Sequence, residues 1–534
     1  MANTSVARST ALMSIATLGS RATGLIRTWT MAFALGNTLI TSAYQVANNM
    51  PNVVYELVAG GLLGAAFIPV YLSQKEKLGT KGGNLFACNL LNLCIVVLGV
   101  LSILATVFAP QVIATQTFTV SDTAAVSVYA TMFFRIFAVQ IVFYGIGGVI
   151  TSILNANRVY FLPSLAPALN NVVVIASFLA YVPLSAVNPD LALVVLAVGT
   201  TLGVVVQFSI QIPALAKLGF RWKPRINLHD PALREAIKIA VPTFVYIVGT
   251  MVSFSCRNAF SLQAGDNGPS TLIYAWTWYQ LPHGVVAVSL SRALFTEMSE
   301  DVAKGDVRAL RRHITSGVSG TLLLIVPLAG LVGALSTPLM QLFQAGAFNA
   351  EDAQYVGSIL ALWVVSMPFY SVLMYLYNVY ASMRKFMTFA LVSTVMVAVQ
   401  CGLYYYLCAP GVLGLAGVPV ADLVYYGSCC MVLLGILRFS LGGIKLGAIL
   451  WKAARTVAAT CVGLALVCLL QRVLPFGDGM AGGLATIMVC GLAGLAVIFA
   501  LCAAFRIPEM AMVTRLLDRF LPSSKKARRG RHAR

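Results

Sequence analysis

Two arginines, Arg21 and Arg27, lie in a stretch that is otherwise apolar enough to cross a membrane. A charged side chain is costly at membrane depth, so a cation kept there indicates a functional site. The planar guanidinium group donates paired hydrogen bonds to phosphate oxygens, which makes arginine well suited to phosphate. These residues therefore predict a polar cavity, and an anionic group is the ligand that fits them.

Six residues of an α-helix turn through about 240°, so a straight helix would point Arg21 and Arg27 in different directions. Gly24 lies between them and would allow a bend that brings both into one cavity. The alternative is that an arginine reaches the membrane surface along its own aliphatic stem.

The next apolar stretch contains Pro51, which removes one helical hydrogen bond, and Glu56, an acid at membrane depth. Gly60 and Gly61 follow within two turns. We predict a hinge formed by Gly24, Pro51, Gly60 and Gly61. Small residues also let membrane helices pack closely, and that alternative stays open.

Three further arginines lie within apolar segments, Arg135, Arg257 and Arg292, whereas the acids there are Glu56 and Asp422. This excess of positive charge favours an anionic substrate over a cationic one. The alternative is that some arginines pair with these acids or extend to the interface. Asp422 is one place where a coupling ion could bind, unless it is a structural partner for a cation.

The sequence shows no catalytic grouping of residues and no P-loop. The 11 cysteines lack metal-ligand spacing. We therefore expect a transporter rather than an enzyme, without a metal or another cofactor. Whether an ion gradient or the membrane potential drives it is left open.

The elements that must position these residues are transmembrane helices. The 534-residue chain is 59% hydrophobic and 10% charged, with a mean hydropathy of +0.86. Apolar runs of roughly 18–25 residues recur along it, so the sequence predicts an all-α polytopic membrane protein. We place about fourteen transmembrane helices at residues 11–34, 40–72, 85–109, 124–152, 163–183, 191–215, 235–257, 270–294, 316–336, 354–380, 388–408, 412–437, 454–474 and 481–504.

Positive charge alternates with these spans. With a cytoplasmic N-terminus, 30 of the 36 lysines and arginines fall in cytoplasmic stretches, five lie within spans, and Arg472 alone lies in an opposite loop. The positive-inside rule then places both termini in the cytoplasm. The net charge of +19 reflects this topology rather than nucleic-acid binding. The basic tail would anchor the topology or, alternatively, bind anionic membrane lipids.

An internal repeat organises the spans. Three pairs of landmarks recur at offsets of 226 to 228 residues: Arg158 with Arg384, Pro110 with Pro338, and Phe67 with Phe295. We infer two parallel six-helix lobes with a substrate site between them, a common plan among transporters. The predicted parts are an N-lobe at 1–220, a C-lobe at 221–445, a helix pair at 446–510 and a basic tail at 511–534.

Several stretches carry a family resemblance. SRATGLIR, PNVVYELVAGGLLGAAFIPV, LNANRVYFLPSLAPALNN, QLPHGVVAVSL, LFQAGAFNAED and ASMRKFMT lie between about residue 9 and about residue 440. Together they resemble the MurJ (MviN) lipid II flippases of the multidrug/oligosaccharidyl-lipid/polysaccharide exporter superfamily. The resemblance implies two six-helix lobes in a bacterial cytoplasmic membrane, with residues 446–510 forming a groove for a lipid tail.

The resemblance also implies site residues. The two first-helix arginines of the family match Arg21 and Arg27. Family positions that are charged elsewhere hold uncharged residues here, at Thr28, Ser42, Tyr55 and Thr277. Glu56 lies beside Tyr55. The family has arginines at the positions of Tyr55 and Thr277, and Arg257 or Arg135 would compensate for their absence. The predicted substrate-binding residues are therefore Arg21, Arg27, Tyr55, Glu56, Arg257 and Thr277.

Three functions fit this sequence. The first is a flippase that moves lipid II, or a related undecaprenyl-pyrophosphate glycolipid, to the outer leaflet by alternating access. The second is an exporter of another polyprenyl-linked glycan or of a drug-like cation, although the excess of buried positive charge disfavours a cation. The third is a non-transporting scaffold that contacts cell-wall synthesis proteins, which the uncharged Tyr55 and Thr277 would suit.

Overall fold

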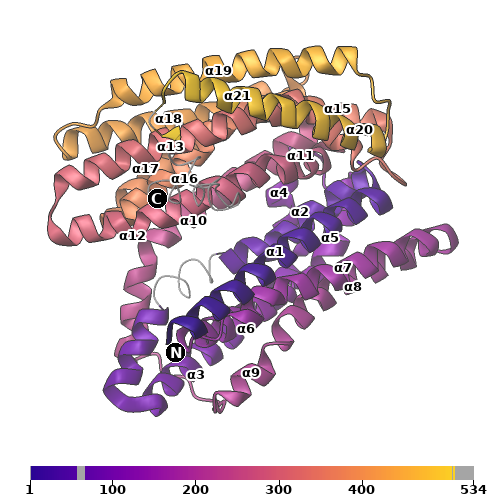
Figure 1. The fold of residues 1–534 in the computed structure, drawn as a ribbon. Coiled ribbons are helices and arrows are strands. Elements are labelled where there is room, and N and C mark those ends of the chain that lie inside the picture. The colour runs from indigo at the N-terminus through magenta and orange to yellow at the C-terminus, as the bar shows by residue number, and fades with distance from the viewer. Residues whose placement is uncertain (1, 57–66, 508, 511–534) are drawn as a thin grey trace, which may run out of the picture. The chain divides into compact units, whose positions relative to one another are not determined.

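A computed structural model describes residues 2–56, 67–507 and 509–510, and their side chains except those of 2–15, 54–56, 238–240 and 242. Within these ranges the regular structure is helical (Figure 1), and the one backbone bridge, between Ala345 and Phe348, is isolated. The predicted all-α class is confirmed.

The first half of the chain forms helices α1 (Ala2–Leu35), α2 (Leu39–Glu56), α3 (Ile68–Val107), α4 (Ala109–Thr117), α5 (Ala125–Phe137), α6 (Gln140–Ala156), α7 (Phe161–Val187), α8 (Pro189–Ser209), α9 (Ile212–Lys217) and α10 (Pro231–Ala264). The second half forms α11 (Gly268–Pro282), η2 (His283–Ala287), α12 (Val288–Lys304), α13 (Val307–Ala334), α14 (Ser336–Gln341), α15 (Ala350–Trp363), η3 (Val364–Ser366), α16 (Met367–Ser382), α17 (Phe386–Leu407), η4 (Gly414–Ala416), α18 (Gly417–Ser440), α19 (Leu446–Val473), α20 (Met480–Thr486), η5 (Ile487–Gly491) and α21 (Leu492–Ala504).

Nine helices of the described part are long and apolar enough to cross a membrane, or ten if one bent pair is a single span. The chain is therefore a multi-pass membrane protein, and the count of fourteen spans stays a prediction. The nine do not include α1, α2, α10 or α11. In α2 the reason is plain, because Gln45, Asn48, Asn49 and Asn52 dilute its hydropathy.

The predicted span at 124–152 is not one straight helix. It is divided into α5 and α6, which are bent by 44° at Ala138 and Val139. Ser102 of α3 donates a hydrogen bond to the carbonyl of Ala138 at 2.8 Å, and so satisfies a backbone group at the break. The sequence analysis missed this bend because neither proline nor glycine marks it.

The sequence predicts a cytoplasmic loop between the spans at 40–72 and 85–109, but the structure extends α3 through this region. Lys75, Lys77 and Lys81 lie within α3, which continues through them with a non-helical residue, Gly79, at φ 69°. A positive φ is open to glycine at little cost, so the chain turns there between two helical pieces.

Two of the repeat landmarks adopt matching local structures. Arg158 and Arg384 both have positive φ, 62° and 56°, directly after α6 and α16. Pro110 and Pro338 each lie in the first turn of a short helix, α4 or α14, just after a long helix ends. Phe67 is fully buried, whereas Phe295 is 37% exposed, so the third pair does not share its surroundings.

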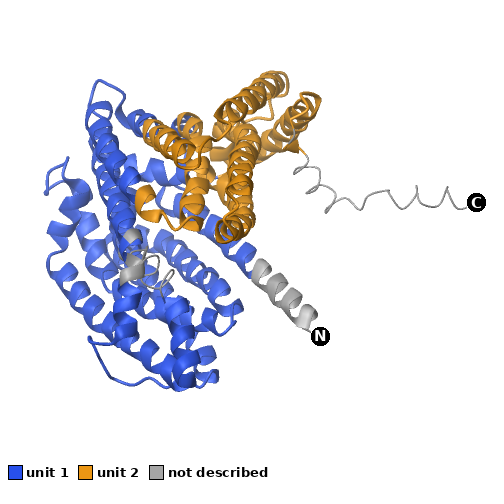
Figure 2. Cartoon of the chain, turned by 90° about the vertical axis from the view of Figure 1, so that its left-hand side faces the viewer, with its two compact units in different colours: residues 1–277, 343–359, 390–421 blue, residues 278–342, 360–389, 422–534 orange. Residues whose placement is uncertain are grey.

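Two compact units are distinguished by their internal contacts (Figure 2). Unit 1 comprises residues 1–277, 343–359 and 390–421, and unit 2 comprises residues 278–342, 360–389 and 422–534. The predicted lobes at 1–220 and 221–445 follow a different division of the chain and stay a prediction.

In unit 1, the segment between α9 and α10 is fastened along α3. Asn89 donates to the carbonyl of Asn227 and accepts from its backbone N–H, at 2.9 and 2.7 Å. Asn92 accepts from the indole N–H of Trp222 at 2.8 Å and donates to the carbonyl of Lys223 at 2.6 Å. Two buried asparagines therefore supply hydrogen-bond partners for backbone groups of this extended segment.

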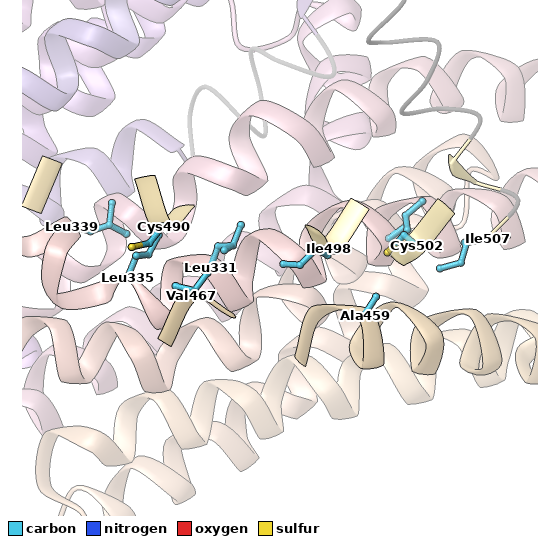
Figure 3. Close-up of a cluster of buried hydrophobic side chains, with 10 residues drawn as sticks. Leu331, Leu335, Leu339, Ala459, Val467, Cys490, Ile498, Cys502 and Ile507 are labelled. Carbon is cyan, nitrogen blue, oxygen red and sulfur yellow. The ribbon is translucent and has the colours of Figure 1, made fainter. Parts of the chain in front are cut away.

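In unit 2, α13 packs against the helix pair α19 and α21 through buried aliphatic and thiol side chains (Figure 3). Gly463 of α19 and Gly494 of α21 allow a close approach, because a Cβ on Gly463 would lie 2.2 Å from Ile498. Among the nine candidate spans these last two helices have the smallest buried shares, 28% and 22%, the former shared with α17. Most of their residues are therefore not buried within the structure, as expected for apolar helices that face lipid.

Candidate functional site

A polar cavity of about 190 Å³ lies inside unit 1, between α1, α2, α6, α7 and α8. It is much larger than the roughly 30 Å³ that one water molecule occupies in the liquid. Its lining is rich in hydrogen-bonding side chains: Arg27, Tyr44, Asn48, Asn52, Tyr144, Asn170, Thr200 and Gln207, with Val174 and Val204. We call it the Arg27 pocket.

Arg27 is half-buried on α1 and supplies the only charge among the described residues that line the pocket. Its guanidinium makes no hydrogen bond or ion pair with a described residue. Tyr44, on α2, interacts electrostatically with it, and the hydroxyl of Tyr44 is hydrogen-bonded to Thr200 at 3.0 Å. The donors of Arg27 are therefore available to a ligand.

Asparagines form much of the remaining wall. Tyr144 donates to Asn52 Oδ1 at 2.9 Å, and Asn52 Nδ2 in turn donates to the carbonyl of Asn48 at 2.8 Å. Asn170 Oδ1 is buried and has no hydrogen-bond partner in the structure. A buried polar atom without a partner is costly, so it favours a bound polar group in this pocket.

The pocket combines a guanidinium group with amide and hydroxyl donors, and no carboxylate is among the described residues that line it. This arrangement fits an anion, because each donor can stabilise a negative oxygen. A cationic ligand would be repelled by Arg27. The pocket is therefore compatible with the anionic substrate that the sequence predicts, and that substrate stays a prediction.

Arg21, the other predicted first-helix ligand, is exposed and is not among the residues that line the pocket. The helix runs without interruption through Gly24. Asn171 of α7 packs there and donates to Thr23 Oγ1 at 3.1 Å. The two arginines thus point in different directions, as the helical angle between them requires. A Cβ at Gly24 would lie 3.6 Å from Asn171 Nδ2, an ordinary van der Waals distance, so packing does not require glycine there. The role of Gly24 as a hinge stays a prediction.

The predicted second-helix residues are only partly described. Pro51 is buried inside a continuous α2. Tyr55 and Glu56 are in the last turn of α2, but their side chains lie outside the described part. Gly60 and Gly61 lie outside it altogether. Their roles in binding and hinge motion stay predictions.

Thr277 is half-buried on α11 and donates its hydroxyl hydrogen to the carbonyl of Ile273 at 3.0 Å. Ser42, where the family resemblance leads us to expect an acid, is fully buried on α2. Its hydroxyl accepts a hydrogen bond from the backbone N–H of Ser270 at 3.3 Å. Both uncharged residues therefore have local partners within unit 1.

Arg257 of α10 is 9% exposed. Its Nε lies 3.4 Å from the hydroxyl of Tyr404, and its guanidinium carbon lies 5.2 Å from the ring of Phe254 and 6.0 Å from that of Trp276. We had allowed that Arg257 extends to the interface, but the structure buries it among aromatic rings. It is not among the residues that line the Arg27 pocket.

Asp422 of α18 is fully buried in unit 2, where it accepts a hydrogen bond from the indole N–H of Trp363 at 2.8 Å. Arg135 and Arg292 are exposed. Asp422 therefore has a neutral indole as a structural partner. Its pairing with a cation and its role in ion coupling both stay predictions.

The asparagines, tyrosines and glutamine of the Arg27 pocket are not among the predicted site residues. One signal was available in α2, where Gln45, Asn48 and Asn52 recur at helical spacing along an apolar segment. Asn170 carried no such signal, because its approach to α1 and α8 is decided by tertiary packing.

In unit 1, several hydrogen bonds join the turn between α1 and α2 to residues 268–274 and 345–348. Asn37 Nδ2 donates to Thr271 Oγ1 at 3.0 Å, and Tyr274 donates to the carbonyl of Gly36 at 2.8 Å. The backbone N–H of Ala347 donates to the carbonyl of Phe33 at 2.9 Å. We call this set, from residues 33–42, 268–274 and 345–348, the Gly36 contact.

The Gly36 contact leaves no room for added side-chain atoms. Gly36 has φ +65°, and a Cβ there would lie 2.5 Å from the carbonyl oxygen of Ala347. Gly346 has φ +60°, and a Cβ there would lie 2.3 Å from the carbonyl oxygen of Phe33. Within unit 1, residues 33–36 of the predicted N-lobe and residues 345–348 of the predicted C-lobe therefore pack backbone to backbone.

Comparison with known proteins identifies the family. The model of the family described as lipid II flippase MurJ matches residues 31–481, most of the chain. The chain belongs to the MurJ family. A Rhizobium meliloti (strain 1021) protein named probable lipid II flippase MurJ is 29% identical over 363 residues, which are 66% of each chain. The lipid II flippase MurJ of Burkholderia cenocepacia is 27% identical and covers 66% of this chain and 68% of its own.

The MurJ fold is also found among solved structures. A lipid II flippase MurJ in an inward closed conformation superposes with a TM-score of 0.76 at 23% identity, covering 92% of this chain and 98% of that one. An inward-facing multidrug resistance transporter of the MATE family and the MOP superfamily gives 0.66 at 15% identity, covering 80% and 95%. Both solved structures therefore share the fold of this chain.

Proposed function

We propose that this MurJ family member moves lipid II, the undecaprenyl-pyrophosphate-linked peptidoglycan precursor, from the inner to the outer leaflet of a bacterial cytoplasmic membrane. The observation that carries this proposal is the Arg27 pocket, where Arg27 is the only charged residue among the described lining residues and makes no hydrogen bond or ion pair with a described residue. Family membership supplies the cargo class, and the pocket supplies a place for its charged group.

In the binding step, Arg27 donates paired hydrogen bonds to the pyrophosphate, and Asn48, Asn52 and Asn170 offer amide groups around it. Arg21, exposed six residues earlier on α1, meets the same anion on its way to the pocket. Each charge-assisted hydrogen bond contributes about 1.5–3 kcal/mol.

Translocation proceeds by alternating access. In the topology that the charge bias predicts, the Gly36 contact lies on the outer side of the membrane and would close unit 1 there. Release of the head group requires this contact to open. Its hydrogen bonds join short polar side chains and backbone groups, which water can solvate in the open state.

The polyprenyl tail stays in the membrane during this cycle. The apolar outer faces of α19 and α21 support a groove for it, since both helices have little buried surface. An ion gradient or the membrane potential supplies the energy. Asp422 is our candidate for coupling, because a buried carboxylate within a span is the kind of group that an ion or proton stabilises.

The decisive experiment replaces each first-helix arginine in the full-length protein. Arg27→Ala and Arg21→Ala are expected to abolish growth of a bacterium depleted of its own flippase, while the protein still inserts into the membrane. A leaflet-resolved assay with lipid II in proteoliposomes is expected to show the same loss, and Arg27→Lys is expected to retain part of the activity.

Arg292→Ala is the matched control, because this arginine also lies in a predicted span but is exposed on α12. It is expected to behave as the wild type. Normal growth with Arg27→Ala at ordinary expression would contradict the proposal. Normal growth with both Arg21 and Arg27 removed would favour a non-transporting scaffold, and transport of another polyprenyl-linked glycan in place of lipid II would change the cargo.

A further inference from the structure

A second cavity of unit 1, of about 550 Å³, lies at the turn between α6 and α7. Its lining shares no residue with the Arg27 pocket. Ile68 and Leu72 of α3 form an apolar wall, and Arg158, Tyr160 and Ser164 bring a cation and two hydroxyl groups to the opposite side. The cavity is therefore amphipathic, with a single charged residue in its lining.

Arg158 occupies an unusual backbone conformation. Its φ is 62°, its N–H donates to the carbonyl of Asn155 at 3.0 Å, and the N–H of Val159 donates to the carbonyl of Leu154 at 2.9 Å. These are the two bonds of a Schellman motif, whose left-handed residue is usually glycine. A residue with a Cβ is disfavoured in that conformation. The left-handed residue of this turn is therefore an arginine where glycine would be easier to accommodate, as it also is at Arg384 and Arg506.

The turn is fixed against α3. Asn157 accepts a hydrogen bond from Lys75 Nζ at 2.8 Å and donates to the hydroxyl of Tyr71 at 3.2 Å. Tyr71 lies between Ile68 and Leu72 in sequence, and Asn157 precedes Arg158. These hydrogen bonds therefore connect the turn that carries Arg158 with the helix that carries the apolar wall. The cavity is therefore a built feature of unit 1 and not a gap beside a loose loop.

The Arg158 side chain is exposed and makes no hydrogen bond or ion pair within the part of the chain that the structure describes. Tyr160 and Phe161 beside it are 38% and 42% exposed. Aromatic residues next to a cation at the end of a span are typical of the level of the lipid head groups. The cavity thus opens where phosphates and acyl chains meet.

We propose that this cavity binds an anionic glycerophospholipid of the leaflet that faces the Arg158 end of α6. Arg158 contacts the phosphate, the hydroxyls of Tyr160 and Ser164 lie beside the head group, and Ile68 and Leu72 pack against an acyl chain. One arginine matches the single negative charge of a phosphodiester. The apolar wall distinguishes this ligand from free phosphate, which would gain nothing from it.

The test uses native mass spectrometry of the purified full-length protein, titrated with phosphatidylglycerol or with phosphatidylcholine. Arg158→Gly removes the guanidinium group but suits the left-handed backbone, so thermal unfolding is expected at the wild-type temperature or above. We expect binding of the first phosphatidylglycerol to be about tenfold weaker, the effect of losing one charge-assisted hydrogen bond. Phosphatidylcholine is expected to bind more weakly to the wild type.

Arg384→Gly is the matched control, since Arg384 has the same left-handed backbone and equivalent hydrogen bonds after α16. It is expected to leave the first binding event unchanged. Wild-type binding by Arg158→Gly, or equal binding of the two lipids by the wild type, would overturn the proposal. Displacement of phosphatidylglycerol by equimolar undecaprenyl pyrophosphate would overturn it too, by making the cargo the occupant, and displacement by inorganic pyrophosphate would show that the apolar wall plays no part.

Discussion

Arg27 and Arg257 lie in predicted spans of the same unit, yet their surroundings differ. Arg27 borders an open cavity of about 190 Å³ and has no hydrogen-bond partner among the described residues. Arg257 is 9% exposed and is held by Tyr404, with the rings of Phe254 and Trp276 on its guanidinium group. Both are cations at membrane depth, but only the first has donors left for a ligand.

The difference separates two ways to keep a charge inside a membrane protein. A guanidinium group that is enclosed by aromatic rings and a hydroxyl is stabilised within the protein and adds to the stability of the fold. A guanidinium group that faces a polar cavity is stabilised by water or a ligand, and can exchange one for the other. Cations within spans are therefore not equally good candidates for binding, and the partners of each one decide its role.

The largest effect is expected from giving Arg27 an internal partner. Asn48→Asp places a carboxylate in the same pocket, where it would pair with Arg27 and repel the pyrophosphate. Transport of lipid II in proteoliposomes is expected to fall tenfold or more, the equivalent of about 1.4 kcal/mol or more in binding. Asn49→Asp, on the next residue of α2 and outside the pocket lining, is the control and is expected to transport normally.

A smaller effect, on stability rather than transport, is expected at the enclosed arginine. Arg257→Met keeps much of the side-chain volume but loses the hydrogen bond to Tyr404 and the charge on the rings. Unfolding measured by tryptophan fluorescence in detergent is expected to become easier by about 1–3 kcal/mol. If this variant folds with unchanged stability yet fails to bind lipid II, then Arg257 is a ligand of the substrate and the contrast with Arg27 is lost.

The smallest effect is expected at Tyr404, the uncharged hydrogen-bond partner of Arg257. Tyr404 is fully buried, and its hydroxyl accepts hydrogen bonds from Gln400 Nε2 at 2.8 Å and from Arg257 Nε at 3.4 Å. Tyr404→Phe is expected to lower the free energy of unfolding by about 1 kcal/mol and to leave transport unchanged. Tyr405→Phe, at an adjacent side chain that is 69% exposed, is expected to change neither quantity.

The sequence alone determined that the protein is a helical membrane protein, and it predicted that the ligand of its site carries negative charge. Repeated apolar runs could form only membrane-spanning helices, because backbone groups in a bilayer must be satisfied within the chain. The excess of arginine over acids within those runs indicated an anionic ligand. The spacing of Arg21 and Arg27 also showed that a straight helix could not aim both at one point, and in the structure only Arg27 lines the pocket.

Tertiary structure decided which polar residues meet. Asn52 and Tyr144 are 92 residues apart in the chain, and Tyr44 and Thr200 are 156 apart, yet each pair shares a hydrogen bond beside Arg27. Local periodicity carries no information about such pairs, because they depend on how α2 packs against α6 and α8. The same packing buried Arg257 among aromatic rings from more than one segment, which its position in the sequence could not reveal. A charge and its helix can be read from the chain, but the partners that satisfy the charge come from other helices.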